Sequence, residues 1–299
     1  MFAKLTRLQA DGLLLLTAAI WGLAFVAQKS GMHGLSPLGF IGIRSAFSAM
    51  VVLPMFIAER RADAAKPPMR RLDWLLMCAT ALAFFGGVWC QQSGMVSASV
   101  TNAGFLTALY VVCTPVIGLL LLRHRPSVII WPACLLAMAG VYLLNGASLS
   151  RFAPGDWLIL LCAVFFGVQI NLMGLLMRRI QRPVTICMMQ SLLCCVVGLS
   201  VAGTSGGLSW HAFVTNLAPL LYAGVVSGGI GFTLQACAQQ HTPSADAAII
   251  MSGEALFAAL GGAVLLHERL GMISWFGCGL ILVAILAVEI LPLLSPRAK

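Results

Sequence analysis

The carboxyl group of Glu254 stands in the middle of a long apolar run, residues 244 to 266, in which no Lys or Arg occurs. A carboxyl group in hydrocarbon without a nearby cation favours its neutral form, and acids placed there are functional in many membrane proteins. Glu254 therefore suits a proton carrier or a partner for a substrate ammonium group. The structural alternative is a protonated side chain that hydrogen-bonds across a helix contact.

Arg44 is the one basic residue deep inside an apolar run, residues 37 to 58. Placing arginine in hydrocarbon costs about 2.5 to 3.5 kcal/mol on the insertion scale, so its side chain should face a bundle interior or a water-filled cavity. Guanidinium and carboxylate groups match in bidentate geometry, which makes Arg44 a candidate anchor for a substrate carboxylate. The alternatives are a structural partner for helix-end carbonyls or an acid, and snorkelling to the nearby interface.

Aromatic and amide side chains in other apolar runs would complete a site around these two charges. The apolar walls would come from Trp21, Phe25, Trp89, Phe105 and Tyr110, and the polar contacts from Gln91, Asn102, Gln169, Asn171 and Gln235. Aromatic rings in membrane helices also lie against lipid or at the interface, and the alternative for the amides is hydrogen bonding between helices. Asn102 and Asp246 could instead cap helices. We expect no metal site and no cofactor.

The elements that position these residues must be membrane helices. The chain has 299 residues, of which 60 % are hydrophobic and 9 % charged, against roughly 45–50 % and about 25 % in soluble domains. At roughly 20 apolar residues per crossing, there is room for about ten spans. The composition excludes a soluble enzyme, a nucleic-acid-binding protein and a disordered scaffold. We expect an all-α integral membrane protein, embedded in the lipid bilayer as a single membrane domain over residues 1–299.

Ten apolar runs bounded by charges, glycines and prolines each predict one transmembrane helix. They are 12–29, 37–58, 72–92, 98–122, 127–145, 156–177, 183–203, 216–238, 244–266 and 272–293. Pro37, Pro126, Pro183 and Pro243 open or nearly open four of them, where the missing N–H costs nothing because the first turn has no acceptor for it.

The basic residues divide unequally between the two sides of this ten-helix arrangement. Of the 18 Lys and Arg residues, 14 fall on the side of the two termini and 3 on the other, and Arg44 remains within a helix. Positive residues concentrate on the cytoplasmic side, so both termini are expected there. The net charge of +9 is thus a topology signal and predicts no nucleic-acid partner. The ten cysteines lie in apolar runs without a CxxC pair, which favours buried free thiols.

The chain also repeats itself weakly. AAIWG at 18–22 corresponds to AVFFG at 163–167, Gly87 and Gln91 correspond to Gly231 and Gln235, and LLRHR at 121–125 corresponds to LLHER at 265–269. Five helices per repeat is an odd number, so the second copy must enter the membrane inverted. We expect one repeat over 12–145 and an inverted one over 156–293, the architecture of many secondary transporters with substrate bound between the repeats.

These residues resemble the drug/metabolite transporter superfamily, and within it the ten-helix EamA-type exporters, over essentially the whole chain. The matching features are AAIWGLAF at 18–25, GIRS at 42–45, NAGFLTALYVVCTP at 102–115, and Glu254 with LLHERLG at 265–271. The sequence is similar to bacterial amino-acid exporters of the YddG type. It departs from the family pattern at Ala255, often Pro in such proteins, so the ninth helix should be less kinked, and at His124, often Glu.

The resemblance implies a secondary transporter of the bacterial inner membrane that exports amino acids, including aromatic and other small ones, or related small metabolites by alternating access. Multidrug and nucleotide-sugar-like transport are alternatives within the superfamily. An accessory membrane protein, a channel or a membrane enzyme are rivals from other classes, but the chain has no HExxH, no GxSxG with an accessible partner and no filter-like loop. Proton-coupled and facilitated transport both stay open. So does the oligomeric state, with which a monomer is compatible.

Overall fold

The computed structural model describes residues 5–63, 68–98, 100–123, 125–144, 153–265 and 271–294, and the regular structure in these ranges is helical. Eight helical segments are long and apolar enough to cross a membrane, and two shorter apolar helices, Ile130–Leu144 and Met272–Ala287, accompany them. Together they occupy the ten predicted runs. The expected all-α, membrane-spanning fold is confirmed.

The first half of the chain forms α1 (Arg7–Ser30), α2 (Pro37–Ala62), α3 (Arg71–Gly94), α4 (Val100–Ala108), α5 (Tyr110–Leu122) and α6 (Ile130–Leu144). The second half forms α7 (Pro154–Arg179), α8 (Pro183–Thr204), α9 (Trp210–Thr215), α10 (Leu217–Leu221), the π-helix η2 (Tyr222–Gly231), α11 (Phe232–Ala238), α12 (Ser244–Met251), α13 (Glu254–Leu265) and α14 (Met272–Leu294). Prolines begin α2 and α8 as predicted.

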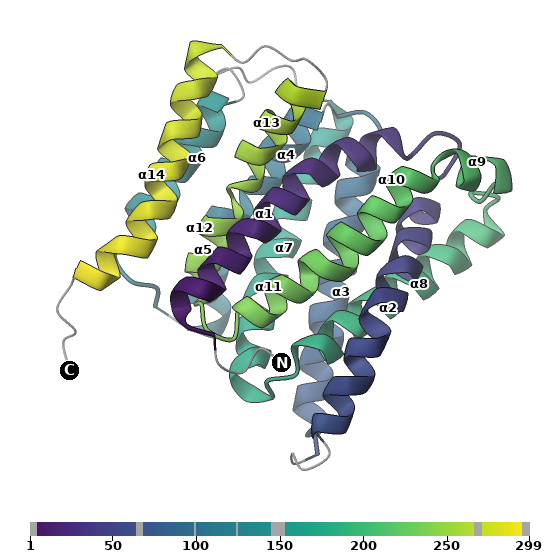
Figure 1. Cartoon of the computed structure of the whole chain (residues 1–299), viewed down its shortest axis with the longest axis horizontal. Helices are drawn as coiled ribbons and strands as arrows, with labels where there is room; N and C mark the ends of the chain where they lie inside the picture. The colour runs from purple at the N-terminus through teal and green to yellow at the C-terminus, as the bar shows by residue number, and fades with distance from the viewer. Residues whose placement is uncertain are drawn as a thin grey trace.

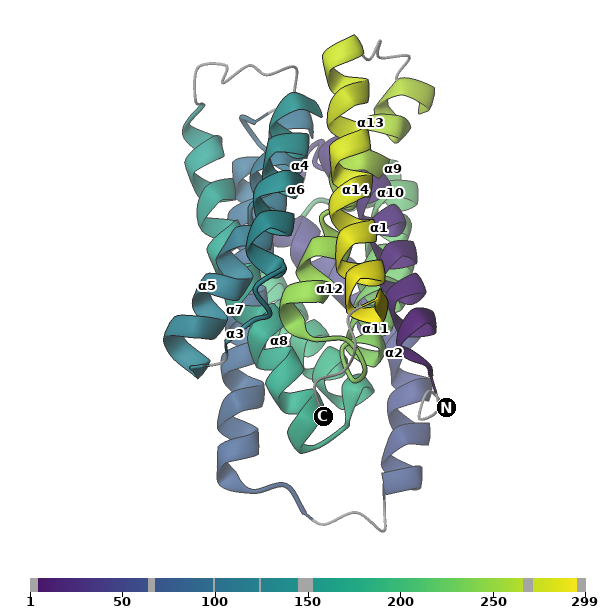
Figure 2. The same ribbon diagram turned by 90° about the vertical axis from the view of Figure 1, so that its left-hand side faces the viewer.

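Corresponding helices of the two halves pack against each other. The second helices, α2 and α8, lie side by side at one edge of the bundle, and the last helices, α6 and α14, pair at the opposite edge (Figures 1 and 2). Between these edges, α1 packs against η2 and α13, and its counterpart α7 packs against α3 and α5. Equivalent helices of the two halves thus make equivalent contacts, which indicates two structural repeats related by an approximate two-fold axis.

The two repeats run in opposite directions. The ends of α1 and α3 meet, because the Lys29 ammonium donates to the carbonyl oxygen of Met95. The start of α7 lies at this same end, because the Gly155 N–H donates to the Ser97 hydroxyl over 3.0 Å. Since α1 and α7 are equivalent helices, the second repeat is inverted.

Two of the ten runs are interrupted, which the prediction of single helices missed, and a third changes helix type within one continuous segment. The fourth run divides into α4 and α5 at Leu109, and the ninth into α12 and α13 at residues 252–253. The eighth run contains the ten-residue π-helix η2 between α10 and α11. Leu109 and Gly253 are 144 residues apart, the offset that relates the repeats in this region. The two mid-helix breaks are therefore equivalent.

Local hydrogen bonds explain the breaks. In the fourth run, the Leu109 N–H donates to the nearer carbonyl of Leu106 over 3.3 Å. Pro115, one and a half turns on, has no N–H to offer the carbonyl of Val111, which accepts from the Cys134 thiol instead. These alternative partners make the irregular backbone tolerable inside a membrane bundle.

In the ninth run, the Ser252 hydroxyl donates to the carbonyl of Ile249 over 2.6 Å. This hydrogen bond competes with the backbone hydrogen bonds that would continue the α-helix. A turn at Ser252 and Gly253 then separates the two helices. The interruption precedes Ala255 and involves a serine and a glycine, so it forms without a proline at that position, and the expectation of a less kinked helix stays a prediction.

Candidate functional site

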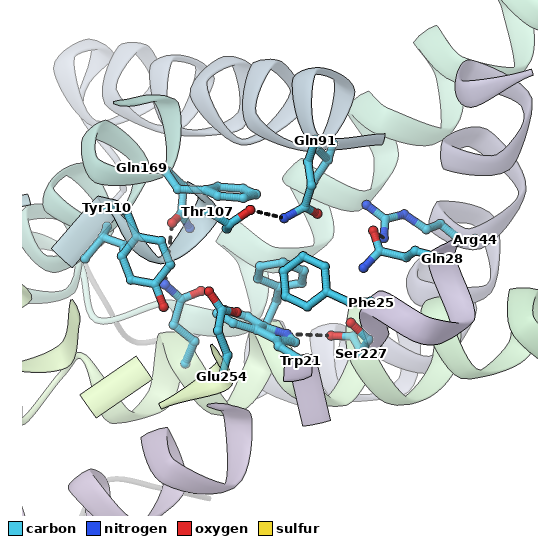
Figure 3. Close-up of a pocket in the computed structure, with 15 residues that line it drawn as sticks. Trp21, Phe25, Gln28, Arg44, Gln91, Thr107, Tyr110, Gln169, Ser227 and Glu254 are labelled. Carbon is cyan, nitrogen blue, oxygen red and sulfur yellow. Dashed lines mark hydrogen bonds between the residues drawn. The ribbon is translucent and has the colours of Figure 1, made fainter. Parts of the chain in front are cut away.

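A cavity lies between the two repeats. Its lining is a mixture of aromatic, amide and charged side chains, many of which are labelled in Figure 3. The lining residues are Trp21, Phe25, Gln28, Arg44, Val88, Gln91, Thr107, Tyr110, Phe166, Gln169, Ile170, Ser227, Phe232, Gln235 and Glu254.

Eight of the ten residues predicted for the site line this cavity: Trp21, Phe25, Arg44, Gln91, Tyr110, Gln169, Gln235 and Glu254. The side chain of Asn102 lies outside the described part of the structure, although its backbone belongs to α4. Trp89 is 40 % exposed on the bundle surface, and Phe105 packs into the apolar core. His124, Glu268 and Arg269, which the sequence comparison singles out, lie outside the described residues.

Asn171 does not join its expected neighbours. Its amide donates to the carbonyl oxygens of Thr114 and Gly167, both over 2.8 Å, and it lines a separate cavity with Arg7 and Asp246. Asn171 lies two residues beyond Gln169 on α7, which turns its side chain by about 200° around the helix. Sequence alone treats both amides alike, but only one of them can face the central cavity.

Glu254 forms one end of the central cavity. Its side chain is buried, with 3 % exposed, and the hydroxyl of Tyr110 faces it (Figure 3). No Lys or Arg of the described residues pairs with it. Its Oε1 has no hydrogen-bond partner among the described residues. A buried carboxyl oxygen without a partner is costly, so a ligand group that donates hydrogen bonds would be favoured here.

Two amides extend this end of the cavity. Gln235 donates to Oε1 of Gln169 over 3.5 Å, which leaves Gln235 Oε1 and Gln169 Nε2 buried without partners in the described structure. Together with Glu254, these atoms offer two acceptors and one donor to whatever occupies the cavity. Buried polar atoms are paired in most folded proteins, so this concentration of unpaired atoms marks a binding surface.

Arg44 forms the opposite end of the cavity (Figure 3). It is buried, with 7 % exposed. Its Nη1 donates to Gln28 Oε1 over 3.2 Å, and its guanidinium carbon lies 5.9 Å from the centre of the Phe40 ring. The ion pairs of the described residues do not include Arg44. A buried cation without a carboxylate is costly, so an anionic ligand group would stabilise it.

Close backbone packing fixes the position of Arg44. A Cβ atom at Gly224 of η2 would lie 2.5 Å from the carbonyl oxygen of Arg44, so only glycine permits this approach of η2 to α2. The π-helix is a common feature of functional sites. Here it also turns the carbonyl of Ser227 toward α1, where it accepts from the Trp21 indole over 3.3 Å.

Aromatic rings form the wall between the two charged ends. Trp21 and Phe25 lie between Glu254 and Arg44 in Figure 3. The Trp21 ring packs on Phe232 with 4.6 Å between centres, and Phe232 meets Phe84 edge-on at the same distance. The wall can therefore receive an apolar or aromatic group between two polar ends.

Sequence reasoning missed several lining residues, namely Gln28, Thr107, Phe166, Ser227 and Phe232. For two of them, the sequence held a pattern from which they could have been predicted. Gln28 lies seven residues after Trp21, on the same helical face. Phe166 corresponds to Trp21 in the repeat alignment.

Ion pairs join the two repeats at the end of the bundle where α1 begins. Arg7 contacts Asp246 at the start of α12. Arg179, at the end of α7, donates from Nε and Nη2 to Asp73 Oδ1 at the start of α3, over 2.9 and 2.8 Å. Charge-assisted hydrogen bonds of this kind are stronger than neutral ones.

Two further carboxylates make contacts between the repeats at this same end. Asp63 pairs with Nε of Arg182 over 3.0 Å. Glu59 accepts from the backbone N–H groups of Val184 and Thr185 over 3.0 and 2.7 Å, which satisfies the start of α8. Each contact joins a helix of one repeat to a helix of the other. We call this region the ion-paired end.

The opposite end is joined by neutral hydrogen bonds. The Ser36 N–H donates to the carbonyl of Gly207 over 3.2 Å, and Asn216 donates to the carbonyl of His33 over 2.8 Å. Among the described residues, the contacts between the repeats thus include ion pairs at one end and neutral hydrogen bonds at the other.

No cluster of three or more His, Cys, Asp or Glu residues that could hold a metal ion occurs in the described ranges. The ten cysteines are free thiols. The lining of the central cavity therefore points to binding by side-chain charge, hydrogen bonding and aromatic packing.

Comparisons with known proteins agree with this architecture. The EamA-like transporter family matches residues 8–146 and 153–290. An uncharacterized transporter of Archaeoglobus fulgidus is 31 % identical over 284 residues, covering 95 % of this chain and 87 % of that protein. The uncharacterized transporter YwfM of Bacillus subtilis is 24 % identical over 285 residues, 93 % of each chain.

A solved structure titled only "Crystal structure of protein" shares the fold, with a TM-score of 0.76 over 97 % of this chain and 99 % of that one, at 15 % identity. The two family matches correspond to the two halves of the helical bundle, and the relative from Archaeoglobus fulgidus spans nearly the whole chain. The chain therefore belongs to the EamA-like transporter family of the drug/metabolite transporter superfamily, and is a multi-pass membrane transporter.

Proposed function

We propose that this transporter exports amino acids, aromatic and other small ones among them, by alternating access between the two repeats. The observation that carries the proposal is the placement of one buried cation, Arg44, and one buried acid, Glu254, at opposite ends of one aromatic-lined cavity. Neither charge has an ion-pair partner among the described residues. A zwitterion would complement both.

Each part of an amino acid finds a matching part of the cavity. The carboxylate pairs with the guanidinium of Arg44, and the ammonium group pairs with Glu254 and the free Oε1 of Gln235. The side chain packs against Trp21 and Phe232. Because both charged ends are desolvated, the free energy of binding depends on the substrate offering both groups.

The same features disfavour the alternatives within the superfamily. A nucleotide sugar carries two phosphate charges, whereas the described lining of the cavity offers a single cation. A hydrophobic drug cation would pair with Glu254 but leave Arg44 buried beside a positive ligand. The zwitterion is the substrate class that leaves neither group uncompensated.

The expected setting is a bacterial inner membrane with both chain termini in the cytoplasm. Supporting this, the basic residues of the described loops and helix ends gather at the ion-paired end, including Arg60, Arg61, Arg70, Arg71, Arg125, Arg178 and Arg179. The opposite end has Lys29. Positive residues concentrate on the cytoplasmic side. A single chain supplies every lining residue of the cavity, so a monomer suffices.

Transport is driven by the substrate gradient in this proposal. Glu254 is the one acid in the described lining of the cavity, and its pairing with the substrate ammonium group leaves it no separate role in carrying a proton. A proton-exchange mechanism would instead require Glu254 to alternate between protonated and charged forms without substrate.

Uptake by purified protein in liposomes tests the proposed function. Labelled amino acids should accumulate to equilibrium and exchange with unlabelled amino acids inside. A nucleotide sugar and a hydrophobic quaternary ammonium cation should compete weakly. Efficient transport of either of these, with no amino acid transported, would contradict the proposal.

A further inference from the structure

A second, smaller cavity adjoins the central one and shares two residues with it, Arg44 and Phe232. It lies between α2, α8 and η2. Its lining residues are Arg44, Ser45, Ser48, Phe84, Cys187, Gln190, Ser191, Ala223, Gly228 and Phe232. We call it the side chamber.

Gln190 is the distinctive residue of the side chamber. Its side chain is 1 % exposed, and neither Nε2 nor Oε1 has a hydrogen-bond partner among the described residues. Burying both polar atoms of an amide without partners is costly, and such groups are rare in folded proteins. The side chamber therefore contains a buried amide whose two polar atoms a polar ligand could pair with.

Arg44 and Gln190 hold equivalent positions in the two repeats. Arg44 follows Pro37, the first residue of α2, by seven positions, and Gln190 follows Pro183, the first residue of α8, by the same number. A serine comes directly after each of them. Since α2 and α8 pack against each other, the symmetry of the fold brings both side chains to one chamber.

The lining of the side chamber favours hydrogen-bond donation to an anion. Among the described residues that line it, Arg44 is the one cation and none is an acid. The Gln190 amide adds an N–H donor, and Ser48 and Ser191 share a hydrogen bond of 2.9 Å in which either hydroxyl can donate. An ammonium group would meet the positive charge of Arg44 here, and an apolar group would leave Gln190 unsatisfied.

We propose that the side chamber is the carboxylate-binding subsite of the transport cavity. The substrate carboxylate enters it beside Arg44 and accepts hydrogen bonds from the guanidinium group and from Nε2 of Gln190. The identification of the whole ligand as an amino acid rests on the proposed function above, whereas the carboxylate specificity rests on the side chamber itself.

This placement divides the substrate between the two cavities. With its carboxylate between α2 and α8, an amino acid directs its side chain toward the aromatic wall and its ammonium group toward the Glu254 end. Gln190 then determines specificity, because it distinguishes a carboxylate from an isosteric apolar group.

Binding to purified protein, measured by titration calorimetry, tests the proposal with three probes. L-phenylalanine carries both charged groups, 3-phenylpropionate carries the carboxylate alone, and L-phenylalanine amide carries the ammonium group alone. The test variant Gln190→Leu removes both polar atoms. The control Gln239→Leu removes another buried glutamine with an unpartnered Oε1, which lines neither of the two cavities.

We expect Gln190→Leu to weaken binding of L-phenylalanine and 3-phenylpropionate by about tenfold, the effect of one lost hydrogen bond to a charged group. Affinity for L-phenylalanine amide should stay unchanged, and Gln239→Leu should leave all three affinities unchanged. Gln190→Glu should weaken both carboxylates further through repulsion. Gln190→Met, which keeps the length of the side chain, replaces Gln190→Leu if that variant does not fold.

The outcomes separate this proposal from the proposed function. Equal affinities in Gln190→Leu and the unmodified protein would overturn the subsite, as would failure of both carboxylate probes to bind the unmodified protein. If 3-phenylpropionate binds with an affinity that depends on Gln190 but L-phenylalanine binds no more tightly, the subsite stands and the amino-acid assignment fails.

Discussion

Tyr110 and Glu254 are the first residues of α5 and α13, and they face each other at one end of the central cavity. They are 144 residues apart, the spacing that relates the two repeats here. Each follows a break in a transmembrane helix, so the same interruption in the two inverted copies delivers both side chains to the cavity. Discontinuous helices at the repeat interface form the binding sites of many transporters.

Replacing Glu254 with Gln separates substrate pairing from proton coupling, because it removes the charge and nearly preserves the shape. We expect Glu254→Gln to weaken amino-acid exchange by about tenfold or more through loss of the ammonium pair. A pH gradient alone should drive no accumulation in the unmodified protein. Accumulation that follows the pH gradient and disappears in Glu254→Gln, while exchange survives, would instead show that Glu254 carries protons.

Breaking an ion pair should open the ion-paired end. Arg179→Ala leaves the buried Asp73 carboxylate without its bidentate partner, which should favour conformations in which this end is open. Ser244 lines the separate cavity near this end that also contains Arg7 and Asp246. In a cysteine-free background with Ser244→Cys, labelling by an impermeant maleimide should become several-fold faster. The charge swap Asp73→Arg with Arg179→Asp should restore slow labelling, and unchanged labelling in Arg179→Ala would contradict a gating role.

A methyl group at position 224 should disturb the site through the backbone of α2. Since a Cβ at Gly224 would lie 2.5 Å from the Arg44 carbonyl oxygen, Gly224→Ala should destabilise the protein by about 1–3 kcal/mol through overpacking. It should also weaken carboxylate binding by displacing Arg44. Gly12→Ala is the matched control, because a Cβ there meets no atom within 4 Å. Thermal unfolding that is the same for both variants would show that η2 and α2 can separate freely.

Topology can be tested at the loop after α3. Val96 is exposed there, and the charge distribution predicts this loop on the outer side. A single cysteine at position 96 in a cysteine-free protein should react with an impermeant thiol reagent added outside cells. Labelling from the inside alone would contradict both the ten-helix arrangement and the placement of the termini in the cytoplasm.

The sequence was sufficient to predict the apolar runs that form the helices and the two charged residues at the ends of the cavity. Burying a lone charge in an apolar run is so unfavourable that Arg44 and Glu254 could be singled out without coordinates, and the structure places both on one cavity. The mid-helix breaks could not be foreseen, because they depend on local hydrogen bonds such as that of Ser252 to Ile249.

Sequence predicted Gln91, Gln169 and Gln235 for the central cavity but did not separate them from amides that lie elsewhere. Asn171 and Gln169 lie two positions apart and look equally suitable, but the helix turns Asn171 into another cavity. Gln190 was overlooked because an amide in an apolar run has no distinguishing feature until its packing is known. Its equivalence to Arg44 becomes meaningful only when α2 and α8 are seen side by side (Figure 1).

Competition between amino acids and their amides, in the unmodified protein and in Arg44→Lys, tests the central claim most directly. If Arg44 anchors the carboxylate, the amides should compete poorly with labelled amino acid, and Arg44→Lys should lower apparent affinity about tenfold to a hundredfold because the bidentate fork is lost. Equal competition by amides and free amino acids, together with normal transport by folded Arg44→Ala protein, would contradict the account and leave Arg44 as a structural residue.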